Sequence, residues 1–181
     1  MTPWNLPNIL SLSRVFLAPL VVVFLTVGRD FKTTLGGVNI ADIIAGVVFI
    51  AASITDAVDG YVARKRGIVT NLGKFIDPLA DKILVVAALI SLVELKGLPA
   101  WIVVIIVSRE FVVSGIRMVA AAEGVVIHAS PAGKAKTVSQ IIAIVMMIFD
   151  MRFALPVMWI AMLMTVGSGL EYLVKGKDFF R

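Results

Sequence analysis

Residues 55–82 of this chain read TDAVDGYVARKRGIVTNLGKFIDPLADK and contain four aspartates near the ends of two long apolar runs. Asp56 and Asp59 are three residues apart, whereas Asp77 and Asp81 are four residues apart. Either spacing places both side chains of a pair on one face of a helix. If the two apolar runs form antiparallel neighbouring helices, all four carboxylates can converge on one point.

Converging carboxylates repel one another, and ionisable groups at membrane depth are costly, so a positive group is expected among them. The chain has no cysteine and a single histidine. Oxygen ligands of this kind favour a hard cation, Mg²⁺ or Mn²⁺, and two such ions could clamp a pyrophosphate. The ordinary alternative is that the aspartates cap helices and pair with nearby Arg and Lys, but capping needs one aspartate per helix end rather than two on one face.

The composition predicts an integral membrane protein. Of the 181 residues, 60% are hydrophobic, whereas average soluble domains contain about 45–50% apolar residues. The net charge of +5 suits a protein that faces anionic lipid headgroups or phosphorylated substrates, and no nucleic-acid partner is expected. Because no repeat or soluble domain is visible, residues 1–181 are expected to form a single membrane domain.

The apolar runs predict an all-α protein with six transmembrane helices preceded by an interfacial N-terminal helix at residues 4–13. The expected spans are residues 15–27, 40–63, 75–95, 100–122, 137–149 and 154–174, with a polar loop at 28–39 and a basic loop at 64–74. Most Lys and Arg residues then fall on one side. By the positive-inside rule, both termini and the aspartates lie at the cytoplasmic face of a multi-pass protein of the cell membrane.

A second set of cations surrounds the loop before the fifth run and comprises Arg109, Arg117, Lys134 and Lys136. Arg109 and Arg117 are eight residues apart, about two helical turns, so they are expected to share a face. Together the four could form a pocket for a second anion, such as the phosphate of an acceptor. The alternative for Lys134 and Lys136 is ordinary positive charge of a cytoplasmic loop.

The aspartate stretch also carries a family resemblance. The pattern Asp56-x2-Asp59-Gly60-x2-Ala63-Arg64-x8-Gly73-x3-Asp77-x3-Asp81 resembles, at every fixed position, the signature of the CDP-alcohol phosphatidyltransferases. Four flanking segments are similar to the branch of this family that uses sn-glycerol 3-phosphate: Asn5-Leu6-Pro7-Asn8 with Arg14, residues 108–117, Gly133-Lys134-x-Lys136-Thr137, and Ser168-Gly169-x-Glu171-Tyr172.

The resemblance implies a six-helix membrane enzyme, usually a homodimer, that transfers a phosphatidyl group from CDP-diacylglycerol to sn-glycerol 3-phosphate and releases CMP. It implies that divalent cations, two per active site, are held by Asp56, Asp59, Asp77 and Asp81, and that Asp81 is also the catalytic base. The implied CDP-binding residues are Asn8, Asp56, Asp59, Gly60, Arg64 and Gly73, of which Gly73 permits close helix approach. The implied glycerol 3-phosphate-binding residues are Arg109, Arg117, Lys134 and Lys136.

Two other functions fit parts of this pattern. The same signature could serve another acceptor, phosphatidylglycerol or inositol phosphate, although the second cation cluster disfavours serine, which carries no phosphate. Six spans with buried carboxylates could also form a cation transporter. Transporters place such groups near the midplane, often between repeated halves, whereas these aspartates lie near the ends of the runs.

Overall fold

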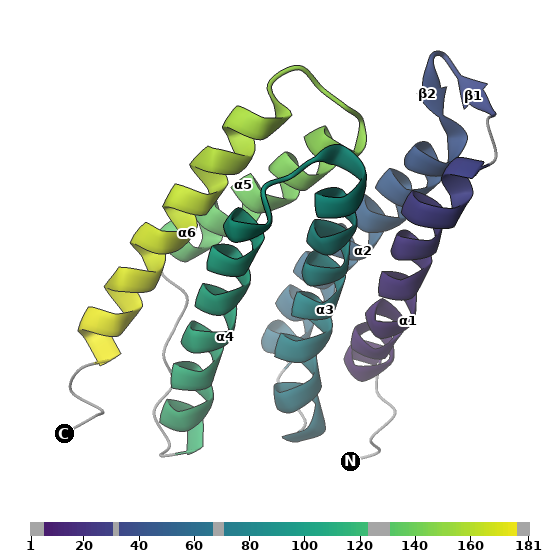
Figure 1. The fold of residues 1–181 in the computed structure, drawn as a ribbon. Coiled ribbons are helices and arrows are strands. Elements are labelled where there is room, and N and C mark those ends of the chain that lie inside the picture. The colour runs from purple at the N-terminus through teal and green to yellow at the C-terminus, as the bar shows by residue number, and fades with distance from the viewer. Residues whose placement is uncertain (1–5, 31–32, 67–70, 123–130, 177–181) are drawn as a thin grey trace.

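The structure is a computed structural model that describes residues 6–30, 33–66, 71–122 and 131–176. Six α-helices make up nearly all of this part of the chain, which confirms the predicted all-α class. They are α1 (Leu6–Thr26), α2 (Ile40–Arg66), α3 (Asn71–Lys96), α4 (Ala100–Ala122), α5 (Pro131–Ile148) and α6 (Ala154–Gly176). The helices alternate in direction along the bundle, and α1 begins at the same end at which α6 finishes (Figure 1).

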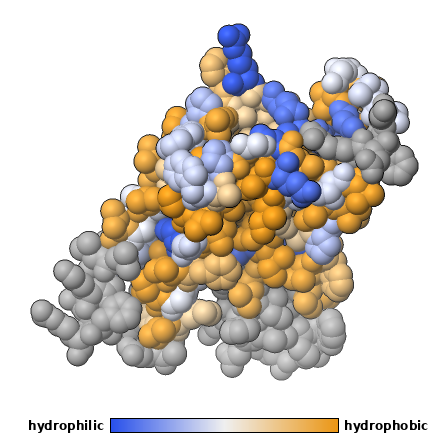
Figure 2. Space-filling model, viewed as in Figure 1, coloured by the Kyte–Doolittle hydropathy of each residue, from blue (hydrophilic) through white to orange (hydrophobic). Residues whose placement is uncertain are grey.

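One helical stretch in the described part of the chain, Ala154–Tyr172 in α6, is long and apolar enough to cross a membrane by length and composition. Two shorter apolar stretches are Leu12–Thr26 and Ile40–Thr55. Charged residues interrupt other runs, as Arg109 and Glu110 do in the middle of α4. Large apolar side chains are nevertheless widely exposed over the bundle, and Figure 2 shows them covering the middle of one face. Such a surface is typical of an interaction site or of contact with lipid.

Two predicted boundaries at the start of the chain are wrong. The segment expected as a separate interfacial helix is, from Leu6 onward, the beginning of α1, which continues without a break through Pro19. The polar loop expected at residues 28–39 contains a short 3₁₀ helix and two short strands. These elements are η1 (Val27–Asp30), β1 (Thr34–Leu35) and β2 (Val38–Asn39).

The two strands form a tight hairpin that leads into α2. Gly36 and Gly37 connect them with φ angles of 61° and 84°, and a two-residue hairpin turn with positive φ at both positions strongly prefers such residues. Asn39 then accepts a hydrogen bond from the Ala41 N–H at 2.8 Å. This is the N-cap arrangement that starts a helix, and it sets the point at which α2 begins.

The helix packing places α1 against both α2 and α3, α5 against α6, and α4 against α6 and α3. Side chains such as Phe49, Leu89 and Ile144 fill the core between the helices. Several hydroxyl groups within the apolar helices donate to the carbonyl four residues earlier, which satisfies them without a partner on another helix. Examples are Ser53 to Phe49, Ser91 to Ala87 and Thr165 to Ala161.

At the hairpin end of the bundle, Lys96 at the end of α3 forms ion pairs with aspartates of two other segments. Its ammonium lies 3.1 Å from Asp42 at the start of α2 and also pairs with Asp150 between α5 and α6. The side chains of Lys96 and Asp42 are only 3% and 5% exposed. Removing one member of a buried ion pair leaves an uncompensated charge, so this cluster ties the ends of α2, α3 and α5 together.

Candidate functional site

The structure places the two aspartate pairs at helix ends that are joined to each other. Asp56 and Asp59 lie in the last turns of α2, and Asp77 and Asp81 lie in the first turns of α3. The step from Arg66 to Asn71 can span at most about 18 Å, because an extended chain covers about 3.6 Å per residue. Both pairs therefore lie at the same end of the bundle.

The side chains of these aspartates, of Asn8 and of Arg64 lie outside the described residues, as do the surroundings of Gly60 and Gly73. Their predicted roles stay predictions. Two carboxylates per helix, at spacings of three and four residues, would supply an all-oxygen donor set, which is the kind that a hard divalent cation prefers. Elsewhere in the described part of the chain, no group of three or more His, Cys, Asp or Glu side chains could hold a metal ion.

A cavity of about 320 Å³ lies next to both aspartate-bearing segments. Its wall includes Ser53, one turn before Asp56 in α2, and Lys82, which follows Asp81 in α3. Residues from α1, α4 and α5 complete the wall, so five of the six helices contribute to it. The polar and charged residues among them are Arg14, Ser53, Lys82, Glu110, Lys134, Lys136, Thr137 and Gln140.

The charges on the cavity wall favour an anion. Among the residues that the structure describes, Arg14, Lys82, Lys134 and Lys136 supply four cations to the wall, against the carboxylate of Glu110. Arg14 and Lys136 are only 1% and 4% exposed. Burial of a charge is costly without a compensating group; Glu110 compensates Lys136 in the free protein, and a phosphate in the cavity would add a further negative group beside these cations. Guanidinium and ammonium groups are the usual protein partners of phosphate.

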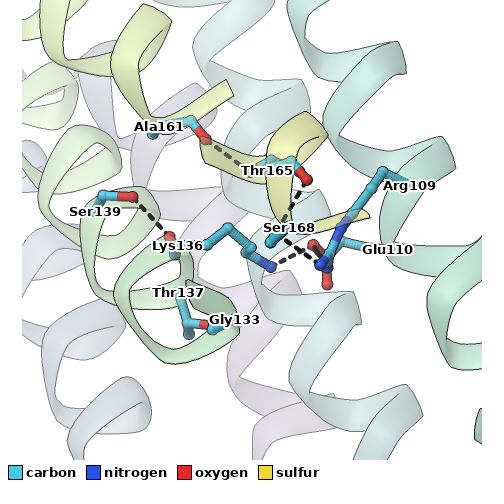
Figure 3. A network of polar contacts seen from close by, with 9 residues as sticks. All are labelled: Arg109, Glu110, Gly133, Lys136, Thr137, Ser139, Ala161, Thr165 and Ser168. Carbon is cyan, nitrogen blue, oxygen red and sulfur yellow. Dashed lines mark hydrogen bonds and ion pairs between the residues drawn. The ribbon is translucent and has the colours of Figure 1, made fainter. Parts of the chain in front are cut away.

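Glu110 lies between a cation of the cavity wall and a cation outside that wall. Its carboxylate, on α4, pairs with the Lys136 ammonium of α5 and with the Arg109 guanidinium at 3.1 Å (Figure 3). Glu110 also faces the cavity. A single carboxylate therefore fixes one cation of the cavity wall and one cation outside it.

Arg109 points toward α6 rather than into the cavity. Its Nη2 donates to the Ser168 hydroxyl at 2.8 Å, and its guanidinium lies 5.8 Å from the centre of the Tyr172 ring. A Cβ added at Gly169 would lie 2.8 Å from Arg109 Cγ, so a larger residue there would force this arginine to shift. The contact holds α4 to α6 and keeps Arg109 beside Glu110.

The predicted cluster of four cations is therefore divided. Lys134 and Lys136 do line the cavity, but they lie in the first turns of α5 and not in a loop, because α5 begins at Pro131. Proline is common at the first position of a helix. Arg109 lies behind the cavity and Arg117 is exposed outside its wall. Their predicted contact with an acceptor phosphate stays a prediction.

Arg14 and Lys82 were missed as lining residues of this pocket. The sequence assigned Arg14 only to the basic side of the protein and to a flanking motif, and gave Lys82 no role. A signal was present for Lys82, because it directly follows Asp81 on a helix that has to face the site. For Arg14 the signal is its burial, which only the packing of α1 between α2 and α3 reveals.

Comparison with known proteins places this arrangement in a family. Residues 4–167 match the family model for CDP-alcohol phosphatidyltransferases. The chain belongs to this family. A relative from Bacillus subtilis (strain 168), named CDP-diacylglycerol–glycerol-3-phosphate 3-phosphatidyltransferase, is 44% identical over 183 residues, which cover 95% of each chain.

Two further relatives extend the comparison. A protein of Mycobacterium tuberculosis (strain H37Rv), named probable phosphatidylglycerophosphate synthase, is 38% identical over 176 residues, which cover 94% of this chain and 81% of the relative. A Mycoplasma pneumoniae protein with the same name as the B. subtilis relative is 40% identical over 160 residues, which cover 83% of this chain and 70% of the relative. The similarity thus spans both the aspartate segments and the cavity.

Proposed function

We propose that this protein transfers the phosphatidyl group of CDP-diacylglycerol to sn-glycerol 3-phosphate, giving phosphatidylglycerophosphate and CMP. The observation that carries this assignment is the cationic cavity that adjoins both aspartate-bearing helix segments. It offers an acceptor phosphate a site of its own beside the predicted reaction centre. The relatives named for this reaction support the choice of acceptor.

We assign the residues to two subsites, one for the donor CDP-diacylglycerol and one for the acceptor. Asp56, Asp59 and Asp77 hold divalent cations together with Asp81, while Asn8, Gly60 and Arg64 hold the CDP portion. Mg²⁺ or Mn²⁺, two ions per site, would supply charge neutralisation of the pyrophosphate and of departing CMP.

The acceptor hydroxyl forms the new bond to the phosphorus that carries diacylglycerol, and the bond from that phosphorus to the CMP oxygen breaks. The hydroxyl proton passes to the carboxylate of Asp81.

The acceptor phosphate occupies the cavity. Lys134, Lys136, Arg14 and Lys82 surround it, and Glu110 holds Lys136 in place. This phosphate site is separate from the site of the donor pyrophosphate. The divalent cations and Arg64, which hold the donor, are assigned to the aspartate segments. This division supports a single direct transfer, because both substrates can be bound at once.

The protein is proposed to cross the cell membrane six times, with the termini and aspartates on the cytoplasmic side, and to form a homodimer. Exposed apolar side chains on every helix, such as Phe16, Val104 and Leu163, support contact with lipid. Cysteine accessibility at the β1–β2 hairpin and at the C-terminus would test the orientation, since the native chain has no cysteine. Light scattering of the protein in detergent would test the dimer.

The reaction itself is tested by CMP release from CDP-diacylglycerol by purified protein with Mg²⁺ or Mn²⁺. Each candidate acceptor is supplied in turn: sn-glycerol 3-phosphate, phosphatidylglycerol and inositol phosphate. Release with glycerol 3-phosphate alone, abolished by EDTA, is the expected result. Release only with another acceptor would retain the metal site and overturn the assignment of the cavity.

A further inference from the structure

Gln140 is a buried polar residue of the cavity wall to which neither the sequence motifs nor the proposed mechanism assigns a role. It lies in α5, one turn after Lys136, and is 3% exposed. Its Nε2 atom is buried and makes no hydrogen bond within the described part of the chain. A buried donor left unsatisfied destabilises the folded state, so such a group calls for an explanation.

Several polar groups of the cavity wall are already engaged with one another and are not hydrogen-bonded to Gln140 Nε2: Glu110 pairs with Lys136, and the Thr137 hydroxyl donates to the Gly133 carbonyl. Leu89, Ile106 and Ile141 line the wall with it and have no polar side-chain atoms. The nearby hydroxyl of Ser53 already donates to the Phe49 carbonyl at 2.8 Å. An amide that only filled space in the core would be replaced at lower cost by an apolar side chain. Its unsatisfied N–H groups therefore point to a polar group of a ligand.

Given the proposed reaction, the acceptor has three polar parts. Its phosphate is matched by the cations of the cavity wall, and its attacking hydroxyl has to lie at the aspartates. The remaining hydroxyl, on the central carbon, is neutral and is best matched by a neutral donor. Gln140 lies four residues, about 6 Å, along the axis of α5 from Lys136, close enough for a short phosphorylated alcohol to contact both side chains.

We propose that Gln140 is a specificity-determining residue whose side-chain amide donates a hydrogen bond to the central hydroxyl of the glycerol 3-phosphate acceptor. It thereby distinguishes glycerol 3-phosphate from phosphorylated alcohols that lack this hydroxyl. A site that hydrogen-bonds a substrate hydroxyl rejects the analogue without it, because a buried polar group is then left unpaired. This inference depends on the proposed function and assigns a residue within the same site.

The test compares two acceptors in the CMP-release assay, sn-glycerol 3-phosphate and 3-hydroxypropyl phosphate, which lacks the central hydroxyl. For the unmodified protein we expect kcat/KM to be about 10- to 100-fold higher with glycerol 3-phosphate. Gln140→Met keeps a similar volume and removes the amide, so the ratio should fall by about tenfold or more. The melting temperature of the variant in detergent should stay the same or rise, because an unsatisfied donor has been removed.

The matched control is Ser139→Ala in the same helix turn. The Ser139 hydroxyl donates to the Lys136 carbonyl and is not part of the cavity wall, so the acceptor ratio should stay unchanged. An unchanged acceptor ratio in Gln140→Met, whatever the melting temperature of the variant, would make Gln140 a structural residue and overturn the proposal. If that variant does not fold, Gln140→Asn, which withdraws the amide by one methylene, is judged by the same ratio.

The outcome also separates this inference from the reaction on which it depends. If the unmodified protein releases no CMP with glycerol 3-phosphate, the proposed function fails and the role of Gln140 fails with it. If it does release CMP but discriminates poorly against 3-hydroxypropyl phosphate, the reaction stands and only the role of Gln140 is overturned.

Discussion

Replacing Glu110 by glutamine should destabilise the free protein while making it more responsive to its acceptor. The Glu110 carboxylate lies between Lys136 and Arg109. At 3.1 Å, its attraction to Arg109 alone amounts to about 5 kcal/mol at an effective dielectric constant of about 20, before desolvation is subtracted. Breaking a buried pair costs about 3–5 kcal/mol. Since the Glu110 side chain is 16% exposed and glutamine can still accept a hydrogen bond, we expect about 3 kcal/mol.

The assay is thermal or denaturant unfolding in detergent, with and without sn-glycerol 3-phosphate. A bound phosphate can replace the lost carboxylate as the counter-charge of Lys136. The stabilisation by saturating glycerol 3-phosphate, which follows from binding to the folded state alone, should therefore be larger in Glu110→Gln than in the unmodified protein. Inorganic phosphate should produce part of the same effect.

Two comparison variants make this prediction specific. Glu94→Gln changes an exposed glutamate of α3 and should alter stability by no more than about 0.5 kcal/mol. The double variant Glu110→Gln/Lys136→Met removes both members of the pair and should be more stable than Glu110→Gln alone, since no uncompensated ammonium is then left. If Glu110→Gln unfolds like the unmodified protein, and phosphate stabilises both equally, the argument from buried charge is refuted.

Three further predictions concern other parts of the molecule. Lys96→Met, which removes the ammonium that pairs with both Asp42 and Asp150, should lower stability by about 3 kcal/mol yet leave the KM for glycerol 3-phosphate unchanged; a shift in KM would mean that the far end of the bundle is coupled to the site. Asp81→Asn should abolish CMP release while CDP-diacylglycerol binding, measured directly, is largely retained; loss of both would make Asp81 a structural metal ligand only. Lys134→Ala, which removes one ammonium of the cavity wall, should raise the KM for glycerol 3-phosphate far more than the KM for CDP-diacylglycerol, and equal effects on the two would contradict the separation of the subsites.

The helical architecture could be predicted from the sequence because long apolar runs are a strong and local signal. The start of α5 shows a limit of predicting helices from apolar runs. The fifth apolar run begins only at residue 137, so Lys134 and Lys136 were expected in the loop before it. In the structure α5 begins at Pro131, because the first turn of a helix needs no hydrogen bond from the proline nitrogen. Lys134 and Lys136 consequently lie on a rigid element and not on a loop.

The residues that line the cavity were harder to predict, because they depend on which face each helix packs against its neighbours. Arg14 is separated from the aspartates by more than forty residues, and only the position of α1 against both α2 and α3 brings it to the wall. Gln140 carries no charge, so an interpretation based on cation clusters could not select it.

Arg109 shows why charge alone identifies a functional region without giving each residue its role. The sequence grouped it with Lys136 as a phosphate-binding cation, whereas the structure places Glu110 between the two. With this carboxylate in place, the free protein can keep Lys136 buried without a ligand, and Arg109 in turn anchors Glu110 to α6 through Ser168. A cation that contacts the ligand and a cation that holds the carboxylate beside it have the same charge and lie close together in the sequence. Only the direction of their side chains separates binding from support, and the response of Glu110→Gln to phosphate measures that difference in solution.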